Sequence, residues 1–175
     1  MTSDAIAPGE SIEVFLAYAI ELEQQAALRF AELADAMQAS GNRECSALFR
    51  RLAEYSRRHL ADARERAGFR QLPRLRPDQF AWPGMESPEA AAIWAADPLI
   101  GRGQALEVAL DAERAGLDFY SELSTAASDP EVRERAGEFA CEEAEHVAEL
   151  ERWLELHRQG SPLPRADPTS VEVSR

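Results

Sequence analysis

A helical pattern that places a glutamate inside an apolar stripe occurs twice in this 175-residue chain, once in each half. Glu23 lies seven residues, or two helical turns, before Phe30, and Glu113 has the same spacing to Tyr120. Apolar residues recur at intervals of three and four around both glutamates, which is typical of helices with one buried face. The stripes are Leu16, Ala19, Ile20, Ala27 and Phe30 in the first half, and Leu106, Ala109, Leu110, Leu117 and Tyr120 in the second. Each half therefore predicts a core-facing helix that carries an acid inward.

A second helix with an inward histidine follows in each half. His59 comes 36 residues after Glu23, and His146 comes 33 residues after Glu113; Glu143 precedes His146 by three. The stripe around this pair is Val132, Ala136, Phe139, Leu150 and Trp153. Burying a carboxylate beside an imidazole is costly unless both are paired, and a metal ion is a strong partner. Two duplicated helical hairpins that each deliver inward ligands indicate a bundle holding a pair of metal ions.

The chain reads as one domain over residues 1–160. Helices are expected over about 10–39, 43–67, 99–126 and 129–159, with Gly and Pro at their boundaries. Residues 68–98 contain five prolines, which exclude a continuous helix and indicate a long crossover between the hairpins. Within it, Ser87-Pro88-Glu89 predicts the start of a short helix through Trp94. Residues 161–175 contain three more prolines and are expected to form a flexible tail.

Composition limits the classes of partner. A net charge of −13 argues against nucleic acid and against anionic membrane surfaces. The longest apolar run near the N-terminus, residues 14–20, is too short for a membrane span or a signal core. Cys45 and Cys141 form no Cys-x-x-Cys pair and predict no disulfide framework. We therefore expect a cytoplasmic protein with no nucleic-acid or membrane partner.

These motifs resemble those of the rubrerythrin branch of the ferritin-like superfamily, over roughly residues 10–159. The segment from Ala81 to Gly84, Ala-Trp-Pro-Gly, is similar to the crossover of bacterial members that lack a rubredoxin domain. The resemblance implies an all-α, ferritin-like four-helix bundle of two duplicated hairpins, joined by the Pro-rich crossover between the second and third helices. The family has one Glu on its first and third helices and Glu-x-x-His on its second and fourth. The positions that match these ligands are Glu23, His59, Glu113, Glu143 and His146.

The resemblance also implies a function. Members usually hold two iron ions and either reduce hydrogen peroxide or oxidise ferrous iron with oxygen or peroxide. By that analogy Glu23, Glu113 and Glu143 clamp or bridge the ions, and the two histidines are terminal ligands. Tyr120 would donate a hydrogen bond to a metal-bound carboxylate or to the oxidant. A separate electron-donor protein would be needed, since the chain has no rubredoxin-type Cys-x-x-Cys, and a homodimer is the implied assembly.

One ligand position departs from the family pattern. The residue three before His59 is Ser56, where the family has a glutamate. Four glutamates balance the charge of two ferrous ions, whereas three leave an excess positive charge in a low-dielectric site. Asp62, one turn after His59, is a candidate replacement, and water or an exogenous anion beside Ser56 is another.

Three functions therefore stay open from the sequence. The first is a di-iron oxidoreductase of the peroxidase or ferroxidase type. The second is a non-redox metal-binding protein whose weakened site holds one ion, either iron or another divalent metal. The third is a structural bundle in which the ligand set is a remnant. Against the third, unpaired buried Glu and His lower stability, and they would be expected to be replaced by apolar residues once metal binding was lost.

Overall fold

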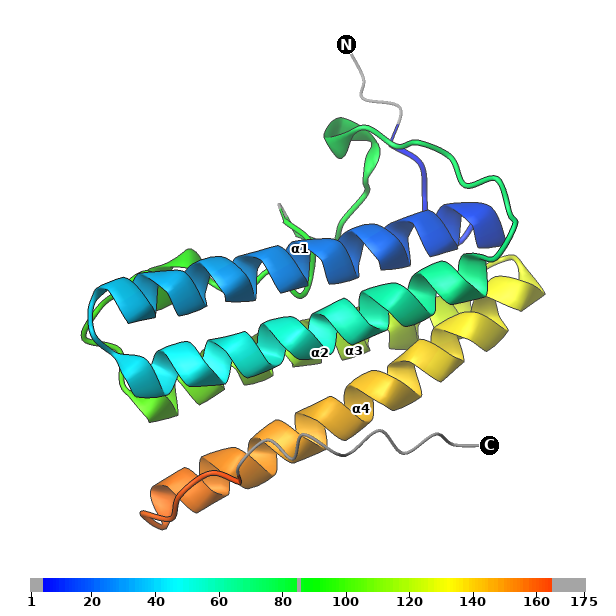
Figure 1. Ribbon diagram of the computed structural model, residues 1–175. Helices are drawn as coiled ribbons and strands as arrows, with labels where there is room; N and C mark the ends of the chain where they lie inside the picture. The colour runs from blue at the N-terminus through cyan, green and yellow to red at the C-terminus, as the bar shows by residue number, and fades with distance from the viewer. Residues whose placement is uncertain (1–4, 85, 165–175) are drawn as a thin grey trace.

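A computed structural model describes residues 5–84 and 86–164, and four long helices dominate this part of the chain (Figure 1). The long helices are α1 (Ile12–Ala39), α2 (Arg43–Ala67), α3 (Arg102–Ala126) and α4 (Pro130–Arg158). Two short 3₁₀ helices, η1 (Pro77–Gln79) and η2 (Ile93–Ala96), lie in the crossover. The described residues contain no strand beyond an isolated bridge between Ile6 and Phe80. The predicted all-α class is confirmed.

The helix boundaries follow from local hydrogen bonding. The side chains of Ser11 and Asn42 accept hydrogen bonds from backbone amides in the first turns of α1 and α2, which satisfies donors that have no partner inside the helix. Asp129 does the same for α4. The start of α3 is later than the expected residue 99. Both the side chain and the backbone carbonyl of Asp97 accept bonds from the next amides, and these hold residues 97–100 in a turn.

The two hairpins predicted from the repeat are present. Helix α1 packs against α2 and helix α3 packs against α4, and the four helices run lengthwise as a bundle (Figure 1). Their apolar faces form two separate clusters. One includes Phe30, Phe49 and Trp153 and lies toward one end of the bundle, and the other includes Phe15 and Phe139 and lies toward the other end. This arrangement leaves a layer between the clusters, in the middle of all four helices, that is not purely apolar.

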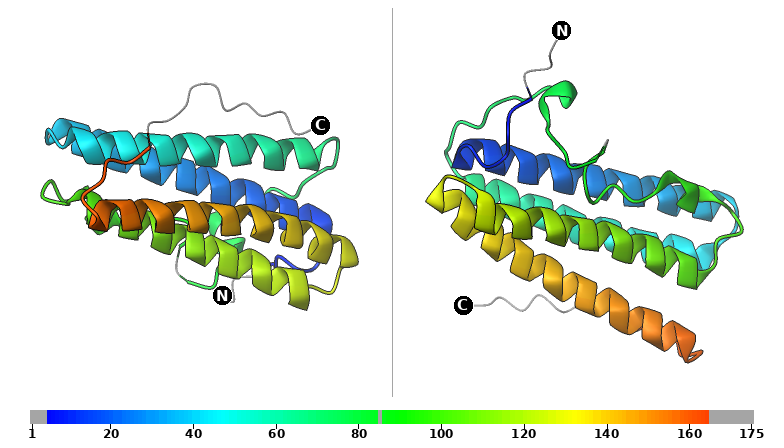
Figure 2. Two further views of the ribbon diagram at one scale, coloured as in Figure 1. Left: turned by 90° about the horizontal axis from the view of Figure 1, so that it is seen from below. Right: turned by 180° about the vertical axis from the view of Figure 1, so that it is seen from behind.

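The crossover covers the side of the bundle formed by α1 and α3 (Figure 2). Its first half is held by aromatic contacts, because the ring centroids of Phe80 and Trp82 each lie 4.8 Å from that of Tyr18. Its second half is held by Arg29 of α1, whose Nη1 donates to the carbonyl of Ala91 at 2.6 Å. Phe80 and Trp82 thus cover the bundle, whereas Trp94 is exposed.

Helix α4 diverges from α2 toward its own C-terminal end (Figure 1). Residues 161–164 return toward α2 at this end, where Arg51 Nη1 donates to the carbonyl of Pro164 at 2.9 Å. Residues 165–175, which make up most of the predicted flexible tail, lie outside the described residues. Within the described ranges no helix combines the length and the apolar character that a membrane crossing requires.

Candidate metal centre

Three glutamates from three helices converge in the layer between the apolar clusters. Glu23 of α1, Glu113 of α3 and Glu143 of α4 are 0%, 7% and 1% exposed. The periodic stripes explain their position, because each occupies a core-facing point of its helix. Among the described residues, the only basic groups within 4.0 Å of these carboxylates are His59 and His146. The structure therefore brings together the five residues that the sequence placed on inward faces.

The two histidines face each other across the bundle. Their rings stack with centroids 4.4 Å apart and planes 19° from parallel. Nδ1 of His146 lies 3.2 Å from Glu113 Oε2 and 3.3 Å from Glu143 Oε2, within hydrogen-bond distance of both. Nδ1 of His59 is 3.7 Å from Glu23 Oε1 and 3.9 Å from Glu143 Oε1, which is too long for hydrogen bonds. His146 is therefore fixed by carboxylates, while His59 is only close to them.

A fourth buried glutamate, Glu89, joins the site from the crossover. It is 3% exposed, and its carboxylate belongs with those of Glu23 and Glu143 to a group whose ligand atoms lie within 4.8 Å of one another. A second such group consists of His59, Glu143 and His146. Glu143 is common to the two groups. Glu113 belongs to neither group and instead contacts His146.

The sequence reading missed Glu89 because it predicted a helix over residues 87–94, and that prediction was wrong. The chain makes a turn here, in which the amide of Ala90 donates to the carbonyl of Ser87, and the only helical piece is η2 further on. An acid in the first turn of a helix is common because the helix dipole favours it, so Glu89 gave no sign of a buried position. One available signal was Gly116, since a glycine inside the helix predicted around Glu113 lowers its stability and leaves room for a close approach.

Burial dominates the electrostatics of the carboxylates. It raises the pKa of Glu23 well above its ordinary value, and the charge of Glu113 adds to the effect. The pKa of Glu89 is likewise raised well above its ordinary value by burial and then by the charge of Glu143. Burial raises the pKa of Glu143 to about 8 despite its hydrogen bond to His146. At neutral pH the metal-free site therefore tends to keep protons on Glu23, Glu89 and Glu143.

The imidazoles respond in opposite directions. Burial disfavours the charged form of His146, but its hydrogen bonds to Glu113 and Glu143 outweigh this and raise its pKa to about 10. The pKa of His59 is lowered by burial and by the neighbouring His146. Burial alone would raise the pKa of Glu113, yet its hydrogen bond to His146 gives a net lowering. The metal-free site thus contains one ion pair, Glu113 with His146, beside a neutral His59.

Several oxygens in the site have no hydrogen-bond partner among the described residues. They are both carboxylate oxygens of Glu23, Oε1 of Glu89, Oε1 of Glu143 and the hydroxyl of Tyr120. Buried polar atoms are rarely unpaired in folded proteins, and an ion that is not shown is one of the usual reasons. Hard carboxylate oxygens together with imidazole nitrogens suit iron and similar divalent ions. The donor set therefore fits a metal site.

The remaining predicted residues have different positions. The hydroxyl of Ser56 donates to the carbonyl of Leu52 at 3.3 Å, so it is used within its own helix. Asp62 is exposed and belongs to neither ligand group of the described residues. It lines an open cavity of about 350 Å³ between α2 and α4 that reaches both imidazoles. The other lining residues are Tyr55, Arg58, His59, Glu145, His146 and Glu149. Asp62 thus lies at the approach to the site.

Comparison with known proteins agrees with this geometry. A family model described as Rubrerythrin matches residues 14–74. The crystal structure of an uncharacterized conserved protein from Magnetospirillum magnetotacticum MS-1 is 34% identical to this chain, covers 90% of it and 99% of its own length, and superposes with a TM-score of 0.64. This chain is a rubrerythrin-like, ferritin-like protein. No curated protein sequence matches it. Membership in the rubrerythrin family suggests iron as the ion for the buried Glu and His groups.

Proposed function

We propose that this rubrerythrin-like protein holds two iron ions and acts as an oxidoreductase, either on hydrogen peroxide or on ferrous iron with oxygen or peroxide. The observation that carries the proposal is the sharing of Glu143 between the imidazole-containing group and the carboxylate group. Two adjacent groups with a common carboxylate support two neighbouring ions rather than one. Bundles of four helices hold paired metals with inward Glu and Glu-x-x-His residues.

The residues have distinct roles in this proposal. His59 and His146, with Glu143, would hold one ion, and Glu23 and Glu143 would contribute to the other. Glu113 would orient His146 through the 3.2 Å contact at Nδ1, which is a common way to fix a ligating imidazole. A ferrous pair bound there would supply the two electrons that, with two protons, convert one hydrogen peroxide into two waters. Repeated turnover would need a separate electron donor.

Tyr120 is the residue best placed to assist a reacting oxygen. Its hydroxyl is fully buried and has no acceptor among the described residues. Burial, followed by the charges of Glu23 and Glu89, raises its pKa well above the ordinary value, so the proton stays on the oxygen. A buried O–H with an unused donor would hydrogen-bond to a ligating carboxylate or to a small oxidant.

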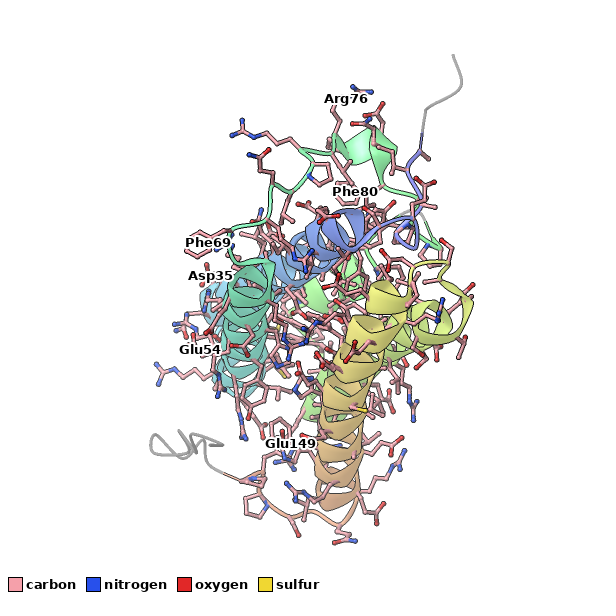
Figure 3. The ribbon with its side chains drawn as sticks, turned by 90° about the vertical axis from the view of Figure 1, so that its right-hand side faces the viewer. Asp35, Glu54, Phe69, Arg76, Phe80 and Glu149 are labelled. Carbon is pink, nitrogen blue, oxygen red and sulfur yellow. The ribbon has the colours of Figure 1, made fainter. Side chains whose placement is uncertain are left out.

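The cavity between α2 and α4 offers a path for such an oxidant. It reaches His59 and His146 directly, whereas the two apolar clusters close the site toward both ends of the bundle. Glu149 lies on the side of α4 that faces α2, at the rim of this opening (Figure 3). Arg58 lies on the α2 side, with its guanidinium 4.7 Å from the Tyr55 ring centroid. The rim thus carries charges of both signs over a polar route to the imidazoles.

A second function is favoured by one observation. His59, Glu143 and His146 alone form a set of two imidazoles and one carboxylate, which is enough for a single divalent ion. Such a protein would bind one metal without redox turnover. The two functions differ in how many ions bind and in what an oxidant does to them.

The test is anaerobic loading with ferrous iron, followed by mixing with hydrogen peroxide or oxygen while near-ultraviolet absorbance is recorded. The oxidoreductase predicts two ions per chain, and oxidation of bound iron at least tenfold faster than that of free ferrous iron. Glu143→Gln should lose both properties, because it removes the carboxylate common to the two groups. One ion per chain with no accelerated oxidation would support the second function and exclude the first.

A further inference from the structure

We infer that Glu89 supplies the fourth carboxylate of the metal centre from the crossover, in place of the acid that Ser56 does not provide. The inference rests on the proposed metal centre and assigns to it a ligand from outside the four helices. Three observations carry it: the position of the Glu89 carboxylate, the space that Gly116 leaves for it, and the contacts that hold the surrounding backbone.

The position of the carboxylate comes first. Glu89 is 3% exposed, and Oε1 has no hydrogen-bond partner among the described residues. Its nearest acidic neighbours are Glu23 and Glu143, with ligand atoms within 4.8 Å of one another. Three carboxylates this close repel one another and are stable as anions only with a cation between them. A residue serving only to cover the bundle would be apolar at this depth.

Gly116 provides the space. It lies on α3, three residues after Glu113 and on the same side of the helix. A β-carbon at position 116 would lie 2.0 Å from Oε1 of Glu89 and 2.7 Å from its Cδ, so any other residue would displace the carboxylate. Glycine inside a helix costs about 1 kcal/mol relative to alanine. The close approach of Glu89 accounts for glycine at this position.

The backbone on either side of Glu89 is fixed to the bundle. We call residues 86–91 the Glu89 strap. Arg29 of α1 donates to the Ala91 carbonyl at 2.6 Å and lies 3.5 Å from the carboxylate of Glu86, so one guanidinium contacts both ends of the strap. Ser87 and Ala91 are buried on either side of Glu89. The strap therefore presents this side chain to the site in a defined position.

The charge of two divalent ions explains why the Glu89 strap carries an acid. Without Glu89, the site has Glu23, Glu113 and Glu143 for two divalent ions and keeps an excess positive charge in a low-dielectric layer. With Glu89, the buried layer holds two imidazoles and four carboxylates, one of which, Glu113, contacts His146. The hydroxyl of Ser56 is bonded to its own helix and is not a substitute. Asp62 is exposed and belongs to neither ligand group of the described chain.

The test compares two site variants with two matched controls, using ferrous iron under anaerobic conditions as the probe. Glu89→Gln removes the charge at nearly constant shape, and Gly116→Ala leaves every acid in place but fills the space of the carboxylate. Glu54→Gln makes the same change at an exposed acid of α2 that pairs with Arg57 of its own helix. Gly137→Ala adds a methyl in a helix where its nearest neighbour is 3.9 Å away. The readouts are iron ions per chain and the thermal midpoint with and without iron.

We expect two ions per chain in the unmodified protein and both controls. Glu89→Gln and Gly116→Ala should retain one ion, or bind the second at least tenfold more weakly. Without metal, Glu89→Gln should melt at the same temperature or higher, because it removes a buried unpaired acid. Its gain in midpoint on iron addition should be smaller than that of the unmodified protein.

The outcomes separate this inference from the proposed function. If Glu89→Gln and the unmodified protein both bind two ions with the same affinity, the inferred role of Glu89 is overturned. The proposed metal centre is not affected by that result. A loss of midpoint in Glu89→Gln that is equally large with and without iron would assign the residue to packing and also overturn the inference. No iron in the unmodified protein would overturn both proposals together.

Discussion

The imidazole rings of His59 and His146 stack in the middle of the bundle, with centroids 4.4 Å apart and planes 19° from parallel. Two imidazolium ions cannot share this geometry at low cost, and the proton is held by His146, which contacts Glu113 and Glu143. His59 lies half-buried beside it with a lowered pKa and stays neutral. In the metal-free site, therefore, His59 has an imidazole nitrogen free to bind a metal ion. His146 can bind one only after the cation displaces its proton.

Replacing His59 should weaken metal binding selectively. His59→Gln removes a ligand of the imidazole-containing group, and we expect ferrous affinity to fall at least tenfold, which is about 1.4 kcal/mol. The matched control is His157→Gln, because His157 accepts a hydrogen bond from Arg102 at 3.0 Å near the end of α4, away from the site. Anaerobic titration of both variants gives the answer. Equal affinities in the two variants would remove His59 from the ligand set.

The metal-free protein should lose stability as pH rises from 6.5 to 8. Folding raises the pKa of Glu143 from 4.5 to about 8 and that of His146 from 6.5 to about 10. In this window the folded chain binds protons that the unfolded chain has released, so the free energy of unfolding falls with pH. The lowered pKa of Glu113 acts below this window, and the lowered pKa of His59 opposes the fall only near its lower edge. Urea midpoints in the presence of a chelator measure the effect.

Iron-loaded protein provides the control for that measurement. Bound metal replaces the protons, so its stability should not fall over the same range. A metal-free midpoint that rises between pH 6.5 and 8 would contradict the protonation states assigned to Glu143 and His146.

Asp62→Asn tests whether Asp62, rather than Glu89, replaces the acid missing at Ser56. Because Asp62 is exposed at the cavity between α2 and α4, its neutralisation should leave two ions per chain. We expect at most a change in the rate of reaction with oxidant, since the charge at the approach changes. Iron counting after anaerobic loading decides the point. Loss of one ion in Asp62→Asn would make Asp62 a ligand.

Two buried tyrosines should respond oppositely to loss of their hydroxyls. Tyr18 donates to the carbonyl of Ile6 at 2.6 Å and accepts from the amide of Ala81, so Tyr18→Phe should cost about 1 kcal/mol of stability or more. The Tyr120 hydroxyl has no partner among the described residues, so Tyr120→Phe should leave the metal-free protein equally or more stable. Denaturant unfolding of the metal-free variants tests this contrast. A loss in Tyr120→Phe as large as that in Tyr18→Phe would contradict it.

Iron-loaded Tyr120→Phe also tests the role of that hydroxyl. It should still bind two ions but react more slowly with peroxide, because the donated proton is gone. An unchanged reaction rate would assign Tyr120 to packing alone.

The helices and the residues on their inner faces were predictable because helical periodicity fixes direction. Once Glu23 falls on the same stripe as Leu16 and Phe30, its side chain must point into the bundle. The same reasoning located His59 and His146, and glycines and prolines marked three of the helix ends to within a residue or so. The repeat then predicted that the two hairpins would bring these side chains to one layer.

Glu89 could not be located in the same way. Residues 68–101 have no period, so nothing in their order says which side chains face the bundle. The direction of Glu89 depends on a turn at Pro88 and on the contact between Arg29 and Ala91, which are 62 positions apart in the chain. The α3 glycine Gly116 was the sequence signal for a close approach, but it does not identify the approaching residue.

Anomalous diffraction at the iron edge, from crystals of the protein loaded anaerobically with ferrous iron, tests the central claim most directly. We predict two peaks per chain in the layer between the apolar clusters, both in contact with Glu143. One peak should also contact His59 and His146, and the other should contact Glu23 and Glu89. A single peak, or no peak among these residues, would contradict a dinuclear centre.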